Sequence, residues 1–184
     1  MRDTTYVAHQ TVLGPFDPSA VSAEEFKHAF RHHASGVAVV TADDGSGPVA
    51  MTVSSVFSVS AEPPALVFSL SATSSATPHV LAAGSVVVHL LAPENAHIAK
   101  LAASHGAERF GTAAAWERLA TGEPVYSEVH TWLRGEIIEE VVIGGSVVVI
   151  VHITQTHLDE AEDRPLLYHN RRWASLAESD YFEV

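Results

Sequence analysis

The 184-residue chain contains no cysteine, so it can form no disulfide, thiolate nucleophile or metal site with a Cys ligand. Only Lys27 and Lys100 are lysines, and the formal net charge is −12. Nucleic acids and anionic membranes need clustered positive charge, so we exclude both as partners. No apolar run approaches the roughly 20 residues of a membrane span. The N-terminus also lacks the apolar core of a signal peptide, so we expect a cytoplasmic protein.

The sequence contains no G-x-G-x-x-G motif, which argues against a dinucleotide-binding Rossmann unit. Many short strand-like stretches, few helices and no alternation of strand with helix predict a mainly β fold with a few short helices. We expect this fold to be an antiparallel β-barrel. One domain over residues 22–176 is predicted, preceded by an N-terminal arm (1–21) and followed by an acidic tail (177–184).

The stretch from Val49 to Ala61 alternates with a period of two. One row is largely apolar, and the other consists of small or hydroxyl side chains, which predicts a strand with two different faces. Small side chains would let a flat ligand approach the backbone and bond to main-chain groups. A solvated sheet face is the alternative reading of the same pattern.

A hydroxyl-rich loop, Ser71 to Thr77, follows the next predicted strand (Ala65 to Leu70). Thr77 is expected to cap a short helix that begins at Pro78. Free amides and hydroxyls at such a place form an anion site, unless the stretch is only a surface loop. One flat ring beside one phosphate describes a mononucleotide such as FMN.

Other candidate side chains have plainer alternatives. His28 and His32 have the four-residue spacing of metal ligands on a predicted helix, but no third ligand accompanies them, and a solvated face is preferred. His89 is interpreted as a core or edge histidine. Arg109 could reach a ligand phosphate or lie on the surface. The segment from Trp116 to Val129 is predicted as a short helix and a connection, and Val147 to Ile153 as a strand buried on both sides.

Several segments in a fixed order resemble the flavin reductase-like family. They are Phe30–Ala42, Gly47–Ser71, Ser74–Thr77, Ser85–Ala103 and Pro165–Leu176. Members of this family are FMN-binding split β-barrels and include the reductase components of two-component flavin-dependent monooxygenases. The resemblance implies an NAD(P)H:flavin oxidoreductase that supplies reduced FMN or FAD to a separate monooxygenase. It also implies a homodimer.

The resemblance, together with the residue pattern, gives a set of expected site residues. Main-chain groups at the flavin ring are expected from Met51, Thr52, Val53, Ser54 and Ser55, and contacts to the ribityl chain and phosphate from Ser69, Ser71, Ser74, Ser75 and Thr77. His169 and Arg171 are expected to contact NADH or NADPH. Hydride transfer to a flavin requires no protein acid or base, so no catalytic side chain is assigned, and no metal is expected.

The chain departs from the family at one turn. Many members carry Gly-Asp-His where this sequence has Gly144-Gly145-Ser146. The missing Asp-His pair bears on nicotinamide binding more than on flavin binding, so an FMN-binding barrel without reductase activity is the alternative function. A flavin-free barrel acting in protein interaction is a third hypothesis, consistent with the acidic composition.

Overall fold

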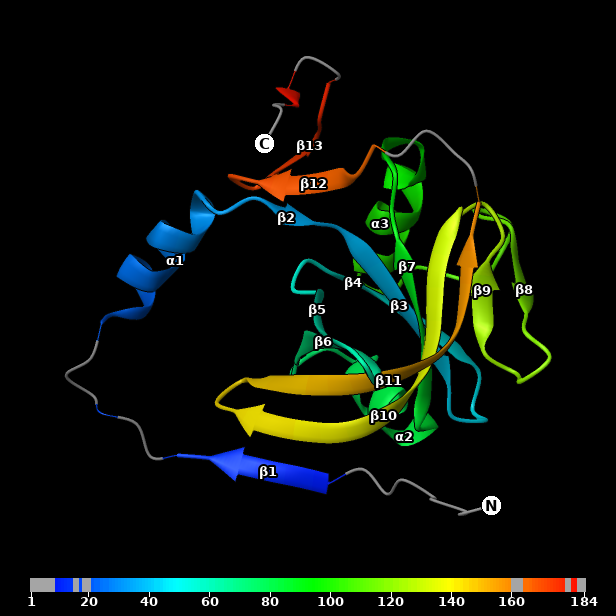
Figure 1. Ribbon diagram of the computed structural model, residues 1–184, viewed down its shortest axis with the longest axis horizontal. Helices are drawn as coiled ribbons and strands as arrows, with labels where there is room; N and C mark the ends of the chain where they lie inside the picture. The colour runs from blue at the N-terminus through cyan, green and yellow to red at the C-terminus, as the bar shows by residue number, and fades with distance from the viewer. Residues whose placement is uncertain (1–8, 15–16, 18–20, 160–163, 178–179, 182–184) are drawn as a thin grey trace.

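The computed structural model describes residues 9–14, 17, 21–159, 164–177 and 180–181. The remaining parts of the predicted N-terminal arm, of the loop after β11 and of the tail lie outside the described residues. The described chain is mainly β, with three short α-helices (Figure 1).

The main sheet has the strand order β4-β3-β7-β10-β11-β6-β5, and every pair along this path is antiparallel. A further strand, β1 (His9–Leu13), pairs with β10 in parallel. The main strands are β3 (Ala38–Asp43), β4 (Pro48–Val53), β5 (Phe57–Ala61), β6 (Pro64–Ser71), β7 (Ser85–Leu90), β10 (Thr131–Ile143) and β11 (Ser146–Leu158).

Two smaller sheets complete the β structure. β12 (Leu166–His169) lies between β13 (Arg172–Ser175) and β2 (Ser35–Gly36), and β8 (Trp116–Arg118) pairs with β9 (Pro124–Tyr126). The helices are α1 (Ala23–Arg31), α2 (Thr77–Ala83) and α3 (Ala96–Ala103), with the 3-10 turn η1 (Pro93–Asn95) before α3. The helix predicted after Trp116 is wrong. This segment forms the β8–β9 hairpin, in which the residues of two short strands pair with each other.

The helix ends follow from local chemistry. Ser22 and Glu25 form a capping box at the start of α1, as the Ser and Glu spacing predicts. Gly84 ends α2 with φ of 70°, a conformation that a residue without Cβ adopts at no steric cost.

β3 is buried on both faces and separates two apolar clusters. Ala38, Val40 and Ala42 face the barrel interior. They belong to the same cluster as Phe68 and Val149. Val39 faces the other side, where Ile98 of α3 and Tyr126 of β9 cover it. β11 was expected to be equally buried, but its residues alternate between buried and half-buried positions, so only one of its faces belongs to the core.

The predicted strand from Val49 to Ala61 is divided into two. β4 ends at Val53, and β5 begins at Phe57 after a bend. The apolar row is buried at Met51 and Val53, whereas Phe57 and Val59 are 63% and 56% exposed. The alternation predicts an extended chain correctly, but after the bend the apolar side of β5 faces outward from the barrel.

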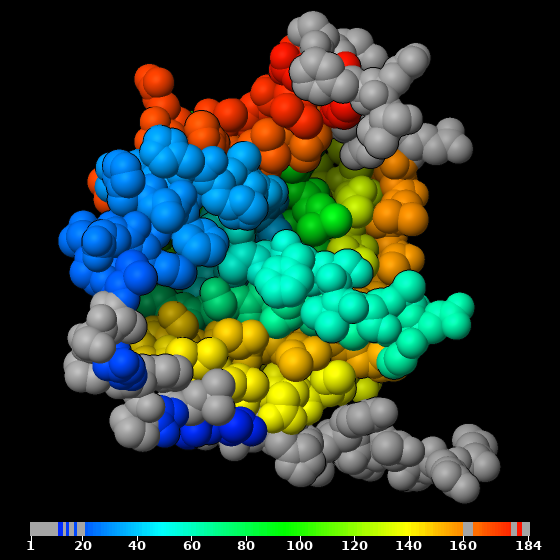
Figure 2. All heavy atoms as spheres, turned by 60° about the vertical axis from the view of Figure 1, so that its left-hand side comes forward, coloured from blue at the N-terminus to red at the C-terminus, as the bar shows by residue number. Residues whose placement is uncertain are grey.

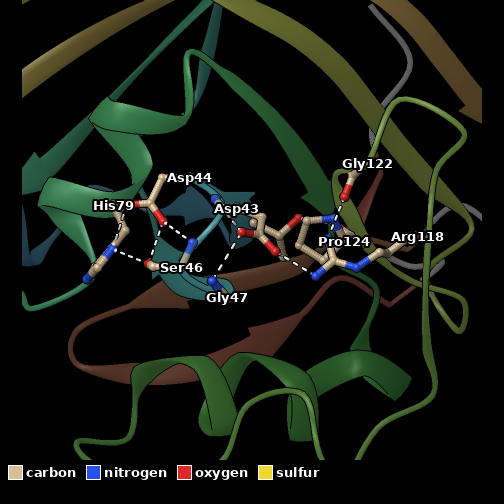
Figure 3. A network of polar contacts seen from close by, with 10 residues as sticks. Asp43, Asp44, Ser46, Gly47, His79, Arg118, Gly122 and Pro124 are labelled. Carbon is tan, nitrogen blue, oxygen red and sulfur yellow. Dashed lines mark hydrogen bonds and ion pairs between the residues drawn. The ribbon is translucent and has the colours of Figure 1, made fainter.

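A network of charged side chains fastens the β3–β4 turn to its neighbours (Figure 3). The Asp43 carboxylate accepts hydrogen bonds from the Gly45 and Gly47 amides at 2.8 and 3.2 Å and from the Arg118 guanidinium at 2.6 Å. Asp44 lies 2.8 Å from Nδ1 of His79 on α2. Hydrogen bonds from the Ser46 hydroxyl and amide, followed by the bond to His79, lower the pKa of Asp44 to about 2.

None of the helices in the described chain is both long and apolar enough to cross a membrane.

Candidate functional site

A pocket of about 530 Å³ opens at the C-terminal end of β4. This volume lies within the roughly 300–1,000 Å³ typical of small-molecule sites. The end of β4, the end of β6, the loop Ser71–Ala76 and the C-terminal end of α3 form its walls. The lining residues are Met51, Thr52, Val53, Ser54, Ser55, Ser69, Ser71, Thr73, Ser74, Ser75, Ala102, Ala103, His105 and Arg109.

Nine of the ten residues expected at the flavin lie in this pocket; the tenth is Thr77. Thr77 is buried, and its hydroxyl donates to the Ser71 carbonyl at 2.7 Å. The residue that precedes α2 is Ala76, without a side-chain cap, so the prediction that Thr77 caps the helix is wrong. Its hydrogen bond instead closes the hydroxyl-rich loop between Ser71 and Thr77.

β4 supplies main-chain groups to the pocket because it is a terminal strand of the sheet. Its hydrogen-bonded neighbour is β3, and no other strand of the described chain pairs with β4. The amides and carbonyls on its second edge therefore have no strand partner. Met51 to Val53 of this strand line the pocket. The Thr52 hydroxyl donates to the Ala99 carbonyl at 2.6 Å and so fixes β4 against α3.

Two serines join the chain after β4 to β6 across the opening of the sheet. The Ser69 amide donates to the Ser55 hydroxyl at 2.9 Å, and the two hydroxyls lie 3.1 Å apart. We call this Ser55–Ser69 contact the seam. Both residues line the pocket, so side-chain hydrogen bonds replace a backbone ladder at this part of its wall.

Among the groups that line the pocket are the hydroxyls of the loop and one guanidinium. The hydroxyls of Ser71 and Thr73 lie 2.9 Å apart on the loop. Arg109 reaches the pocket from the segment after α3, where its Nε and Nη2 donate to the carbonyls of Ala102 and Ser104 at 3.2 and 3.0 Å. Two bonds leave other guanidinium N–H groups available to an anion. Of the two readings of Arg109 left open by the sequence, the structure supports the pocket position.

His105 also lines the pocket and was missed, since nothing in its sequence context distinguishes it from the other eleven histidines. His169 and Arg171, expected at the nicotinamide nucleotide, are not among the lining residues. They lie at the β12–β13 turn, where Arg171 lines a different hollow beside α1. The structure therefore brings the flavin candidates together and places the nucleotide candidates elsewhere on the same chain.

His89 is a core histidine, as interpreted from the sequence. Its Nδ1 donates to the Val39 carbonyl, and its Nε2 accepts from the Tyr126 amide, both at 3.1 Å. Complete burial is the main cause that lowers the pKa of His89 to about 4. The ring is therefore neutral at neutral pH and serves as a bridge between β3 and β9.

The rings of His28 on α1 and His32 just after it lie edge to face, with centroids 5.5 Å apart. No group of three or more His, Cys, Asp or Glu side chains within the described ranges is arranged to hold a metal ion.

Comparison with known proteins decides the family. The model of the flavin reductase-like domain matches residues 30–177. The chain belongs to the flavin reductase-like family. The predicted family and the predicted mainly β, antiparallel fold are both confirmed.

Two relatives whose names state an activity align with nearly the whole chain. An NADH:FMN oxidoreductase from Rhodococcus erythropolis is 37% identical over 173 residues, covering 92% of this chain and 90% of that protein. An NADH:riboflavin 5′-phosphate oxidoreductase from Streptomyces pristinaespiralis is 33% identical over 165 residues, covering 87% and 93%.

Among solved structures, a flavin reductase domain protein from Arthrobacter sp. FB24 superposes with a TM-score of 0.80 and 32% identity, covering 86% of this chain and 98% of that one. BorF, the flavin reductase component of a bacterial two-component tryptophan halogenase, gives a TM-score of 0.76 with 25% identity, covering 85% and 99%.

Proposed function

We propose that this protein is an NADH-dependent flavin reductase with FMN as the preferred flavin. The observation that carries the proposal is the pocket at the end of β4, which gathers nine of the ten residues expected at the flavin. The names of the relatives, NADH:FMN oxidoreductase and NADH:riboflavin 5′-phosphate oxidoreductase, support both the acceptor and the donor.

The residues present fit a flavin mononucleotide. The open edge of β4 offers alternating amides and carbonyls to the hydrogen-bonding rim of the ring, while buried Met51 and Val53 back it. The loop hydroxyls of Ser71, Ser74 and Ser75 suit the ribityl chain and phosphate. Arg109 supplies the positive charge that a phosphate needs in a molecule with a net charge of −12.

Bound flavin supplies the chemistry: its N5 accepts a hydride from reduced nicotinamide, so FMN, NADH and a proton become reduced FMN and NAD⁺. The contribution of the protein is position. The β4 edge and the seam would hold the ring, and the loop would hold the phosphate. Holding two rings in line at near-attack distance is worth several orders of magnitude in rate.

We also propose a homodimer in the cytoplasm that passes reduced flavin to a separate oxygenase. Phe57 and Val59 support the dimer, because the residues of β5 stand out at the centre of one face of the molecule with α1 beside them (Figure 2). The two-component halogenase to which BorF belongs supports the idea of a separate oxygenase.

The test is anaerobic stopped-flow absorbance at the oxidised flavin band, with FMN or FAD and NADH or NADPH. We expect rapid bleaching with FMN and NADH. Ser75→Ala removes a hydroxyl at the phosphate end and should weaken FMN binding about tenfold, the effect of one good hydrogen bond. Ser127→Ala, at an exposed position outside the pocket, is the control and should behave as the unmodified protein.

A second function, FMN binding without reductase activity, is favoured by the turn at Gly144-Gly145-Ser146. This turn touches the phosphate loop, since the Ala72 amide donates to the Gly145 carbonyl at 2.9 Å and Ser146 pairs with Ser71. The family's Asp-His pair would therefore stand beside the pocket, and here small residues replace it. Tight FMN binding without bleaching by either nucleotide would establish this second function and contradict the first.

A further inference from the structure

A histidine on α2 is hydrogen-bonded to the β3–β4 turn, away from the flavin pocket (Figure 3). Nδ1 of His79 lies 2.8 Å from Oδ2 of Asp44 and 3.2 Å from the Ser46 hydroxyl. Hydrogen bonds from Ser46, followed by the one from His79, lower the pKa of Asp44 to about 2, so its carboxylate is ionised and can only accept. Nδ1 of His79 therefore carries the hydrogen and donates it to Asp44. We name this Asp44–His79 hydrogen bond the tether.

The two carboxylate oxygens of Asp44 have separate partners. Oδ1 accepts from the amide and the hydroxyl of Ser46, at 3.0 and 2.5 Å, and so closes the turn. Oδ2 is the oxygen that faces His79. The turn is itself fixed from the other side, because Arg118 donates to the preceding residue, Asp43, at 2.6 Å. The β3–β4 turn is therefore a firm anchor for α2.

The helix α2 has few other means of holding its position. It is seven residues long, and its first residue has no side-chain cap. Helices of this length are marginal without tertiary contacts. Thr77 and Val80 are buried on its inner side, but apolar burial is non-directional and does not by itself fix where a helix lies along a sheet. His79 is the one ionisable side chain of α2, and its hydrogen bond supplies that direction.

The two elements joined by the tether lead to two different walls of the flavin pocket. β4 begins just after the turn, at Pro48, and lines the pocket from Met51 to its end at Val53. The loop Ser71–Ala76 lines the pocket and runs directly into α2 at Thr77. Five residue steps along β4 separate its start from its end by roughly 17 Å. The tether thus joins the two walls without lining the pocket itself.

We propose that His79 and Asp44 are positioning residues for the flavin: the tether holds the start of α2, and with it the loop Ser71–Ala76, at the distance from β4 that suits a flavin carrying a phosphate. The inference rests on the proposed function, in which β4 holds the ring and the loop holds the phosphate. Riboflavin has the same ring and ribityl chain but no phosphate. The tether therefore favours FMN over riboflavin.

The test is a flavin fluorescence titration with FMN and with riboflavin. His79→Leu removes the donor and should raise the Kd for FMN about threefold, the effect of one half-exposed hydrogen bond to a charged group, with no change for riboflavin. His79→Asn places an amide nitrogen where Nδ1 lies and should retain the affinity of the unmodified protein for FMN. Leucine favours a helix more than asparagine does, so an effect of helix propensity would give the opposite order.

Asp44→Asn tests the other end of the tether. Its Oδ1 can still close the turn with Ser46, whereas its amide group places a second donor opposite Nδ1 of His79. We expect the same threefold loss for FMN, about as large in the double variant with His79→Leu, because both changes remove one contact. His130→Leu is the matched control, since Nδ1 of His130 lies 3.4 Å from Asp159 outside the pocket, and it should change neither affinity.

The titration contains no nicotinamide nucleotide, so its result is independent of the reductase reaction. If NADH bleaches FMN and the His79→Leu variant keeps the affinity for FMN, the reductase function stands and the inference is overturned. If neither nucleotide bleaches bound FMN, the reductase function fails and the two Kd values alone decide the inference. Equal losses for FMN and riboflavin would show a general structural role and overturn it, and so would an unmodified protein that binds FMN no more tightly than riboflavin.

Discussion

At the scale of single residues, burial of His89 makes stability depend on pH. The folded pKa of about 4 lies below the ordinary value of 6.5, so the unfolded chain binds the proton more readily. The contribution is complete above the unfolded value and is lost as pH falls toward the folded one. Between pH 7 and pH 5 we expect the free energy of unfolding to decrease by about 2 kcal/mol through this group.

Urea unfolding at the two pH values measures this decrease. His89→Asn should remove most of it, because asparagine does not titrate, whereas His32→Asn, at the exposed residue that follows α1, is the control. A His89→Asn variant that keeps the full pH dependence would show that another group is responsible.

Glu123 gives a second prediction at this scale. It is nearly buried, and Nη2 of Arg134 donates to it at 2.8 Å. Burial alone would raise the pKa of Glu123, but hydrogen bonds from Ser85, Thr121 and Arg134 together lower it to about 2. Glu123→Gln removes the buried counter-charge of the Arg134 guanidinium, which then keeps only the exposed Glu136 carboxylate at 3.6 Å, and should destabilise the protein by about 3 kcal/mol.

Chemical denaturation measures this loss. Glu117→Gln, an exposed carboxylate on the neighbouring strand, should lie within about 0.5 kcal/mol of the unmodified protein. Equal stability of the two variants would contradict the role of the buried pair.

The flavin candidates were predictable from the sequence because alternation and hydroxyl density are local patterns. Ser69 and Ser71 lie on one face of β6, and Ser54 and Ser55 follow directly on β4. The presence of Arg109 and His105 in the pocket depends instead on where the end of α3 packs, and no local sequence pattern predicts that packing. The separation of His169 from the pocket likewise depends on the small sheet formed with β2.

At the scale of elements, the loop from Ser71 to Ala76 is held by Thr77 rather than by a helix cap. Thr77→Val keeps the shape but removes the hydrogen bond to the Ser71 carbonyl. We expect FMN affinity to decrease about tenfold, since the loop hydroxyls lose their fixed positions. Thr77→Ser should retain the affinity of the unmodified protein in a flavin fluorescence titration, and a loss as large as that of Thr77→Val would point to packing instead.

Element boundaries were predicted less well where tertiary contacts decide them. The period-two pattern over Val49–Ala61 contains no signal for the bend after Val53, because the hydroxyl row runs through it. The sequence predicts a short helix and a connection where the β8–β9 hairpin lies, since three-residue strands are too short to show a period. Capping at Ser22 and termination at Gly84, by contrast, depend on local chemistry and were found.

At the scale of the whole molecule, the exposed apolar side chains of β5 predict that two copies of the chain associate through this strand. Replacing exposed Phe57 and Val59 with serine should convert the proposed dimer to a monomer, because both apolar side chains would lie at the interface. Sedimentation velocity measures the change. Leu158→Ser removes a side chain that is 71% exposed on β11 and is the control. If the double variant sediments like the unmodified protein, β5 does not form the interface.

The open edge of β4 has a consequence for handling the protein. An unpaired strand edge is a template for another chain, and proteins usually cover such edges. Bound flavin would cover the part of this edge that the pocket reaches, whereas protein stripped of flavin leaves that part open to solvent. Preparations depleted of FMN should therefore precipitate sooner on storage than those kept saturated, and flavin would act as a folding partner that suppresses aggregation as well as a reactant.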